Sequence, residues 1–202
     1  MSAPEAAASE RGAAIALRSC AVDIVEIAPL RGRALEMQSL IEARGSRLPP
    51  VGRMAGTADR WVLCVRPGRW LLLEPRGEPG VRAARWESDC VGIGTAVELT
   101  AAFLVLDIAG PAAREVLARG CRLDLDPGRF AAGSAARTLM AQVPVILGAH
   151  AAGVLLLTPS TTAQHFSEWL IMTAKPFGLT PGAELASTLH RSAWPPGRSV
   201  QT

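Results

Sequence analysis

The sequence contains no tyrosine and few other aromatic residues, which together make up 4% of its 202 positions. Proteins that bind nucleic acids usually combine aromatic stacking residues with a concentrated basic surface. Here 21 basic and 18 acidic residues leave a formal net charge of only +3, and no basic run is longer than two residues. We therefore expect no nucleic-acid partner.

The chain also lacks the cysteine and histidine spacings of metal and redox sites. Its four cysteines and three histidines are dispersed, with no C-x-x-C pair: Cys20, Cys64, Cys90, Cys121, His150, His165 and His190. Isolated cysteines are typical of a reducing compartment, where they behave as small buried hydrophobic residues. We therefore expect no metal-ligating residue in this chain.

Targeting and membrane-crossing segments are not apparent either. Residues 1–12 contain Glu5 and Glu10 and no apolar block of signal-peptide length. No window approaches the ~20 apolar residues that a helix needs to cross a bilayer. These features predict a soluble, cytoplasmic protein without a membrane partner.

What the sequence does contain is a large apolar fraction. Hydrophobic residues make up 49% of the chain and charged residues 19%, so it can form one substantial domain or two small units that share a core. The apolar content has two explanations. Either many alanines fill small core positions, or the chain is a subunit that hides part of its surface against partners. Composition alone favours the first.

Hydrophobic periodicity predicts an alternation of strands and helices. Strands are expected at residues 20–28, 60–65, 70–73, 91–99, 103–108, 135–142, 143–147 and 153–158. Helices are expected at residues 34–43, 79–86, 111–119 and 161–174, and a loop at 45–56. Ser160 or Thr161 could cap the last helix, whose buried stripe would be formed by Phe166, Trp169 and Leu170.

This order predicts an α+β fold made of two related strand–helix–strand half-units, each an antiparallel-rich sheet backed by helices. The half-units are expected at about residues 15–100 and 101–174. Residues 1–14 are expected to be disordered. Residues 175–202 are expected to form a Pro/Gly-rich tail, disordered or loosely packed, in which residues 183–189 could form a short helix.

The segment at residues 105–144 gives the most detailed local prediction. Its helix is expected to begin with Pro111 at the first helical position and to end at a left-handed Gly120. Helical spacing predicts an apolar face and a charged face pointing away from it: Ala113, Val116 and Leu117 against Arg114, Glu115 and Arg119. The turn that follows is expected to be anchored by three apolar side chains: Leu123, Leu125 and Phe130.

The same segment holds residues of types that can carry chemistry. Cys121 follows a helix C-terminus, where the helix dipole would raise the pKa of its thiol, which favours a structural role. Asp124 and Asp126 could act as paired carboxylates, but their place before Pro127 is typical of a turn that the side chains cap. We expect turn structure there.

Other candidate residues also favour structural roles. The Gly92-x-Gly94 pair lacks the third glycine and the following helix of a dinucleotide-binding loop. His165 is expected to be a packed or surface histidine, and Trp61 and Trp70 to fill the core or an interface. We therefore expect no catalytic, cofactor-binding or metal-ligating residue in this chain.

Beyond these local patterns, residues 110–139 resemble the central signature of a known family, the gamma subunits of heterotetrameric sarcosine oxidase. The positions that carry the resemblance are Gly110, Pro111, Ala113, Arg114, Leu117, Gly120, Cys121, Leu123, Asp124, Leu125, Pro127, Phe130, Gly133, Thr138 and Leu139. Residues 67–73 (P-G-R-W-L-L-L) and 166–170 agree in order and spacing. The resemblance spans roughly residues 20 to 174.

The resemblance implies a fold similar to the folate-binding domains of the glycine-cleavage T-protein and a structural, non-catalytic role. It implies alpha, beta and delta partner subunits, with FAD, FMN, NAD and tetrahydrofolate bound by the partners and no cofactor in this chain. The complex would oxidatively demethylate sarcosine to glycine. It would pass the one-carbon unit to tetrahydrofolate or release formaldehyde, and reduce oxygen to peroxide.

Two alternatives remain. The gamma-type subunit of an N-methylglutamate dehydrogenase is similar in sequence, so one subunit does not identify the methylated amino acid. A stand-alone folate-binding protein of the T-protein type is a different class. Its iron–sulfur-maturation relatives carry K-G-C, an aromatic residue and then G-Q-E. Arg119-Gly120-Cys121 echoes only the first three positions, and residues 122–126 (R-L-D-L-D) depart from the rest.

Overall fold

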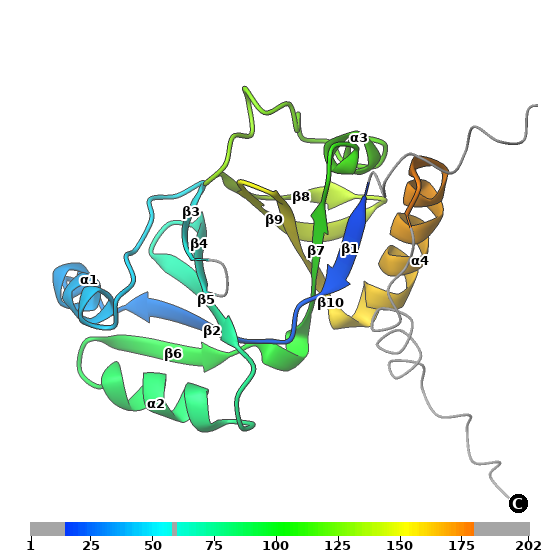
Figure 1. Ribbon diagram of the computed structural model, residues 1–202. Coiled ribbons are helices and arrows are strands. Elements are labelled where there is room, and N and C mark those ends of the chain that lie inside the picture. Colours follow the sequence, from blue (N-terminus) through cyan, green and yellow to red (C-terminus); the bar gives the residue numbers. More distant parts are fainter. Residues whose placement is uncertain (1–14, 58–59, 180–202) are drawn as a thin grey trace, which may run out of the picture.

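Two five-stranded antiparallel sheets form the centre of the molecule (Figure 1). The computed structural model describes residues 15–57 and 60–179. Sheet A has the order β1 (Ala16–Ser19), β7 (Phe103–Ala109), β10 (Gly153–Pro159), β9 (Val143–His150) and β8 (Ala135–Met140). Sheet B has the order β3 (Arg53–Gly56), β4 (Trp61–Arg66), β5 (Arg69–Pro75), β2 (Val22–Pro29) and β6 (Gly94–Glu98). The predicted α+β class is confirmed.

Helices cover the outer face of each sheet (Figure 1). The helices are α1 (Ala34–Ala43) and α2 (Val81–Asp89) on sheet B, and α3 (Ala113–Ala118) and α4 (Ala163–Ala174) on sheet A. Short 3-10 turns lie at Thr100–Ala102, Ser160–Thr162 and Lys175–Phe177. Within the described residues, no helix combines the length and apolarity needed to cross a membrane.

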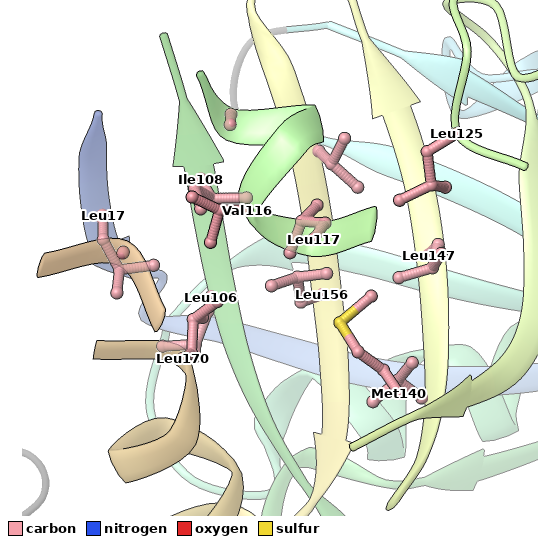
Figure 2. Close-up of a cluster of buried hydrophobic side chains, with 14 of the residues drawn as sticks. Leu17, Leu106, Ile108, Val116, Leu117, Leu125, Met140, Leu147, Leu156 and Leu170 are labelled. Atoms are coloured by element: carbon pink, nitrogen blue, oxygen red, sulfur yellow. The ribbon is translucent and has the colours of Figure 1, made fainter. Parts of the chain in front are cut away.

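The central strands are buried on both faces because their apolar residues alternate between two cores. In β10, Leu155 and Leu157 face sheet B, whereas Val154 and Leu156 face the helices of sheet A. Figure 2 shows Leu156 beneath Leu117 of α3 on this helix-covered side. The result is a layered arrangement in which the inner faces of the two sheets pack against each other.

The two sheets are related in topology but differ in the origin of one edge strand. Each contains one strand, then a helix, three strands and a second helix in chain order. In sheet B the next strand, β6, returns to pair with β2. In sheet A the equivalent edge beside β7 is occupied by β1, which comes from the start of the described chain. Strand β1 therefore links the first half of the sequence to the sheet of the second half.

Two strands were not predicted from the sequence. Both β1 and β3 are only four residues long, and β3 lies in the segment expected to be a loop. Strand β3 is stabilised by contacts that are distant in sequence. Besides pairing with β4, its Met54 amide donates to the Gly133 carbonyl at 2.8 Å, and the neighbouring Gly52 carbonyl accepts from Ala135 at 2.8 Å. These bonds join the edges of the two sheets.

Several predicted boundaries were wrong by a few residues. Strand β6 begins at Gly94 after a turn, and α2 runs two to three residues later than expected. Strand β8 stops at Met140, because Ala141 and Gln142 adopt left-handed φ values of 50° and 65° in a two-residue hairpin turn. The predicted helix over residues 34–43 is confirmed at both ends.

The predicted termini of two helices were also wrong. Helix α3 begins at Ala113, so Pro111 lies in the turn before it. Helix α4 has no side-chain cap, and the Ser160 hydroxyl instead donates to the Ala101 carbonyl at 2.7 Å. Its expected apolar stripe is confirmed: Phe166 and Leu170 are fully buried and Trp169 is partly buried.

Gly120 is needed for close packing and not for a left-handed turn. Its φ lies outside the positive range adopted by other glycines in the fold. A Cβ at this position would overlap the ring of Trp169 in α4 and lie 3.2 Å from the Ala141 amide nitrogen. The glycine therefore lets the end of α3 approach α4 and the β8–β9 turn.

The turn after α3 is anchored as predicted, with one additional contact. Leu125 and Phe130 are buried, and Leu123 is partly buried against the same core. Arg114 was expected to point away, but its guanidinium donates to the carbonyls of Leu125 and Phe130 at 2.6 and 2.9 Å. The expected apolar face of α3 and the Glu115–Arg119 ion pair are both present.

The two aspartates of this segment stabilise its turns. Asp124 accepts the amide of Asp126 at 3.0 Å, and Asp126 accepts the amide of Gly128 at 2.8 Å. Such side-chain-to-backbone bonds are typical of Asx turns. The predicted turn structure at both aspartates is therefore confirmed.

The described chain continues past residue 174. The turn at Lys175–Phe177 packs Phe177 under the Arg119 guanidinium, and Leu179 is buried against sheet A. The predictions for residues 1–14 and for a helix at 183–189 lie outside the described residues.

The anchored turn gives a graded stability prediction. Phe130→Ala should lower the free energy of unfolding by about 3–5 kcal/mol, because it empties a buried site. Leu123→Ala should lower it less, since this side chain is only partly buried. Val91→Ala, at a residue that is 78% exposed, serves as the control. Urea unfolding measures all three, and equal effects of the three changes would contradict this role of the turn.

Candidate functional site

A buried carboxylate in sheet A lies at the centre of one polar cluster. Asp107 lies in β7, whose other residues are all apolar, and its side chain is 3% exposed. Arg18 in β1 donates to one carboxylate oxygen from Nε at 2.9 Å and from Nη2 at 2.7 Å. Nε2 of His150 at the end of β9 lies 2.8 Å from the other oxygen. Three strands thus contribute to one charge-assisted cluster.

The bonding of His150 determines what this cluster can do chemically. Its Nδ1 accepts the Ala152 amide at 3.3 Å, so in the neutral ring Nε2 carries the proton and donates it to Asp107. Both ring nitrogens are therefore occupied within the chain. A general base needs a free nitrogen within reach of substrate, so this arrangement is suited to fixing the β9–β10 turn.

The pKa values of two groups, Asp107 and the neighbouring Cys20, are shifted from their ordinary values. Burial acts to raise the pKa of Asp107, but the bonds from His150 and Arg18 outweigh it and the pKa lies below its ordinary value. Burial, and then the charge of Asp107, raise the pKa of the nearby Cys20 thiol to about 11. Asp107 is therefore ionised and Cys20 protonated at neutral pH.

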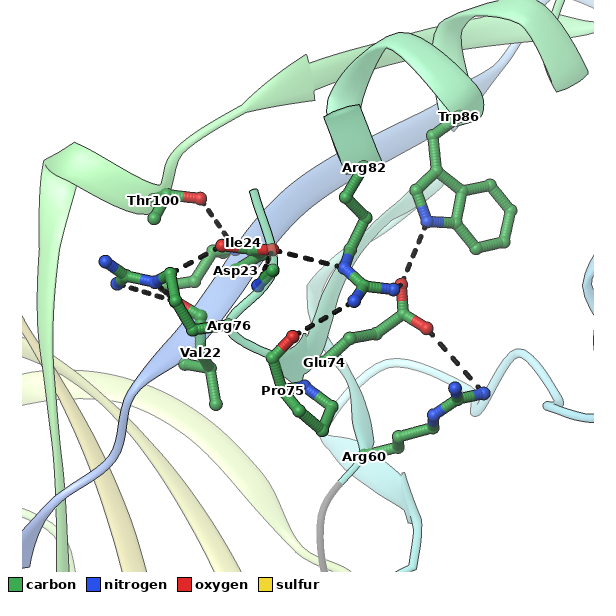
Figure 3. A network of polar contacts seen from close by, with 11 residues as sticks. Val22, Asp23, Ile24, Arg60, Glu74, Pro75, Arg76, Arg82, Trp86 and Thr100 are labelled. Carbon is green, nitrogen blue, oxygen red and sulfur yellow. Dashed lines mark hydrogen bonds and ion pairs between the residues drawn. The ribbon is translucent and has the colours of Figure 1, made fainter. Parts of the chain in front are cut away.

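A second polar cluster fixes α2 to sheet B (Figure 3). Arg82 of α2 pairs with Asp23 of β2 at 3.2 Å and with Glu74 of β5 at 3.0 Å. Glu74 also accepts from the Trp86 indole at 3.2 Å and lies 3.8 Å from the guanidinium of Arg60. Asp23 and Glu74 are thus both bonded to side chains of neighbouring elements.

Between the two clusters runs a surface depression that we call the arginine groove. It consists of three adjoining hollows of about 190, 660 and 550 Å³. Neighbouring hollows share lining residues: the first two share Arg44 and Arg60, and the last two share Arg47 and Gly56. The groove follows the loop after α1 and the described residues of β3 and β4, from α2 to the β9–β10 turn.

The thiol predicted to be structural has the expected properties. Cys121 is half-buried, and the pKa of its thiol is raised. The main cause is burial, with hydrogen bonds to Leu123 and Thr138 acting in the opposite direction. The dipole of a helix C-terminus was the expected cause. A raised pKa does not favour a reactive thiolate.

The remaining candidates fill structural positions. A Cβ on Gly94 would overlap Met37 and the Ala28 carbonyl, so this glycine allows β6 to pack closely and does not form a phosphate-binding turn. His165 is exposed on α4. Trp61 is buried between the sheets, and the Trp70 indole donates to the Pro49 carbonyl at 2.8 Å.

Sequence reasoning missed the Asp107 cluster. Arg18 and His150 are 89 and 43 residues from Asp107 along the chain, so no local motif connects them. The one available signal was an aspartate inside an otherwise apolar strand. In residues 15–57 and 60–179 no group of three or more His, Cys, Asp or Glu side chains has the geometry of a metal site.

The Asp107 cluster predicts a specific pH dependence. Asp107→Asn should lower the free energy of unfolding by about 1–3 kcal/mol at neutral pH, because Arg18 and His150 lose a charged acceptor. The contribution of a carboxylate with a lowered pKa is complete above its ordinary value of 3.8 and is lost as the pH falls through the folded-state pKa. Wild type and variant should therefore begin to converge as the pH falls below 3.8, and should meet only below the folded-state pKa.

Urea unfolding at several pH values measures this convergence. Glu87→Gln, which removes an exposed carboxylate on α2, is the control and should change the free energy of unfolding little at any pH. A difference between wild type and Asp107→Asn that stays constant on acidification would contradict the assignment.

Comparison with known proteins gives relatives of one kind. The sarcosine oxidase subunit gamma of Corynebacterium sp. (strain P-1) is 31% identical over 153 residues, which cover 72% of each chain. The subunit gamma of an Arthrobacter species is 32% identical over 136 residues, 66% of each chain. No protein-family profile matches the chain.

Solved structures agree in fold. A chain of the heterotetrameric sarcosine oxidase from Corynebacterium sp. U-96, in complex with pyrrole 2-carboxylate, superposes with a TM-score of 0.72 at 26% identity. The match covers 86% of this chain and 90% of that one. The glycine cleavage aminomethyltransferase T from Bartonella henselae shares the fold over 46% of its length, with a TM-score of 0.60 at 17% identity.

The sequence relatives and the solved oxidase structure agree over most of the described residues. The predicted family resemblance is therefore confirmed, and the chain belongs to the family of sarcosine oxidase gamma subunits.

Proposed function

We propose that this chain is the small, non-catalytic subunit of a heterotetrameric sarcosine oxidase and supports assembly of its flavin-containing subunits. The main support for the proposal is the match to a sarcosine oxidase gamma subunit over 72% of both chains. By its family resemblance, the complex demethylates sarcosine oxidatively to glycine. Alpha, beta and delta subunits would be the partners of this chain.

The internal bonding of its reactive groups supports a non-catalytic role. Both nitrogens of His150 are occupied, and burial raises the pKa of all four thiols: Cys20, Cys64, Cys90 and Cys121. The carboxylates of Asp23, Glu74 and Asp107 are bonded to arginines of the same chain. These groups hold the fold together and are not directed at a substrate.

Cofactor chemistry would belong to the partners under this proposal. FAD, FMN, NAD and tetrahydrofolate would be bound by the larger subunits, which would carry out the oxidation and the one-carbon transfer. The T-protein-like fold of this chain would serve as a framework for assembly. Four unpaired cysteines support a cytoplasmic location, because thiols persist in a reducing compartment.

Co-purification tests this function directly. The full chain carries an affinity tag, is expressed with the products of its neighbouring genes, and is recovered together with whatever it binds. We expect a heteromeric complex with flavin absorbance and sarcosine-dependent peroxide formation. Turnover with N-methylglutamate and not sarcosine would reassign the substrate. A monomer that recovers no flavoprotein and binds tetrahydrofolate alone would contradict the proposal.

A further inference from the structure

We propose that the arginine groove is the docking surface for an extended acidic segment of a partner polypeptide. This inference rests on the proposed function, since it identifies the surface through which the chain would join its complex. Three properties of the groove support it: an excess of positive charge, two arginines without partners in the described structure, and a shape that suits an extended ligand.

The charge of the groove is strongly one-sided. Six arginines line the three hollows: Arg18, Arg44, Arg47, Arg60, Arg82 and Arg85. Among the described lining residues, the only carboxylates are Glu74 and Asp89 in the smallest hollow. Glu74 accepts from Arg82 and Trp86, and Asp89 pairs with Arg44. Arg18 pairs with Asp107, so among the described residues Arg47, Arg60 and Arg85 are the groove arginines with little negative charge beside them.

Two of the arginines are available for a ligand. Arg47 and Arg85 are exposed, and neither has an ion pair or hydrogen bond with another described residue. The side chain of Arg60 is 52% exposed, and among the described residues its one ion-pair contact is that with Glu74 at 3.8 Å. Guanidinium groups bind carboxylates through paired, parallel hydrogen bonds. A segment rich in aspartate or glutamate supplies such groups at repeated intervals.

The shape of the groove favours a polypeptide over a small molecule. Two of its hollows are each within the usual size of a small-molecule pocket, ~300–1,000 Å³, but all three adjoin and form one longer depression. Its lining also includes Trp86, Trp61 and Val62, which are largely buried and expose only small apolar areas to the groove. An extended segment can place carboxylates on the arginines and its apolar atoms against these walls.

Charge reversal tests the groove in the assembled complex. The double variant Arg47→Glu/Arg85→Glu changes two exposed residues, so its thermal stability should match wild type. The control Arg31→Glu/Arg122→Glu makes the same charge change at exposed arginines outside the groove. At low salt, we expect the groove variant to recover about tenfold less flavoprotein partner, because like charges at an interface repel. The control should recover the wild-type amount.

A peptide probe tests the ligand class without the partner. A short polyglutamate peptide should change the fluorescence of wild-type protein through Trp61 and Trp86, and the groove variant should bind it about tenfold more weakly. An oligonucleotide of equal charge should bind less tightly than the peptide. Tighter binding of the oligonucleotide would overturn the proposed ligand class.

The outcomes separate this inference from the proposed function. If wild type recovers its flavoprotein partners and the groove variant recovers them equally well, the groove inference is wrong and the proposed function stands. If the groove variant and the control both lose the partners, the effect is one of overall charge and the groove inference is again wrong. If wild type recovers no flavoprotein, the proposed function is wrong and this inference with it.

Discussion

The packing of the two sheets through their inner faces is the constraint on which the rest of the structure depends. Residues such as Leu73 of sheet B and Leu155 of sheet A are fully buried in this shared core. Burying one such side chain contributes ~1.5–3 kcal/mol, so separating the sheets would expose a large apolar surface. Strand β1 and the bonds between β3 and residues 133–135 hold the sheets together at their edges. The two half-units therefore share one core.

The sequence predicted the parts of this fold that depend on local periodicity. Helix α1 was located at both ends, and the central strands were found because their apolar runs are long. Strands β1 and β3 were missed because four residues carry little pattern and their pairing partners are distant in sequence. The roles of Arg114, Gly120 and Asp107 could not be predicted for the same reason. Their roles depend on carbonyls, a tryptophan ring and charged groups that only the folded chain brings near. The expectation of no catalytic residue rested on the ordinary structural explanation that each candidate had, and it stays a prediction.

Most buried polar groups of the described chain are bonded within it. Asp107 fixes β1 and the β9–β10 turn to β7, and Asp23 and Glu74 fix α2 to sheet B. Such bonds stabilise a framework, since removing either partner would leave the other without its acceptor or donor. In the arginine groove, Arg47 and Arg85 have no described partner. Such a basic surface on a stable framework is well suited to a companion subunit that binds an acidic segment.

Amide hydrogen exchange, compared between the chain alone and the chain in its complex, tests this account most directly. Assembly should slow exchange in residues 44–47 and 54–57, which line the arginine groove, because a bound segment would shield these amides from water. Exchange in β6, the edge strand of sheet B opposite β3, should change little. Protection confined to the side of α1 and β6, where Leu35 and Val97 are exposed, with none in the groove, would contradict the account.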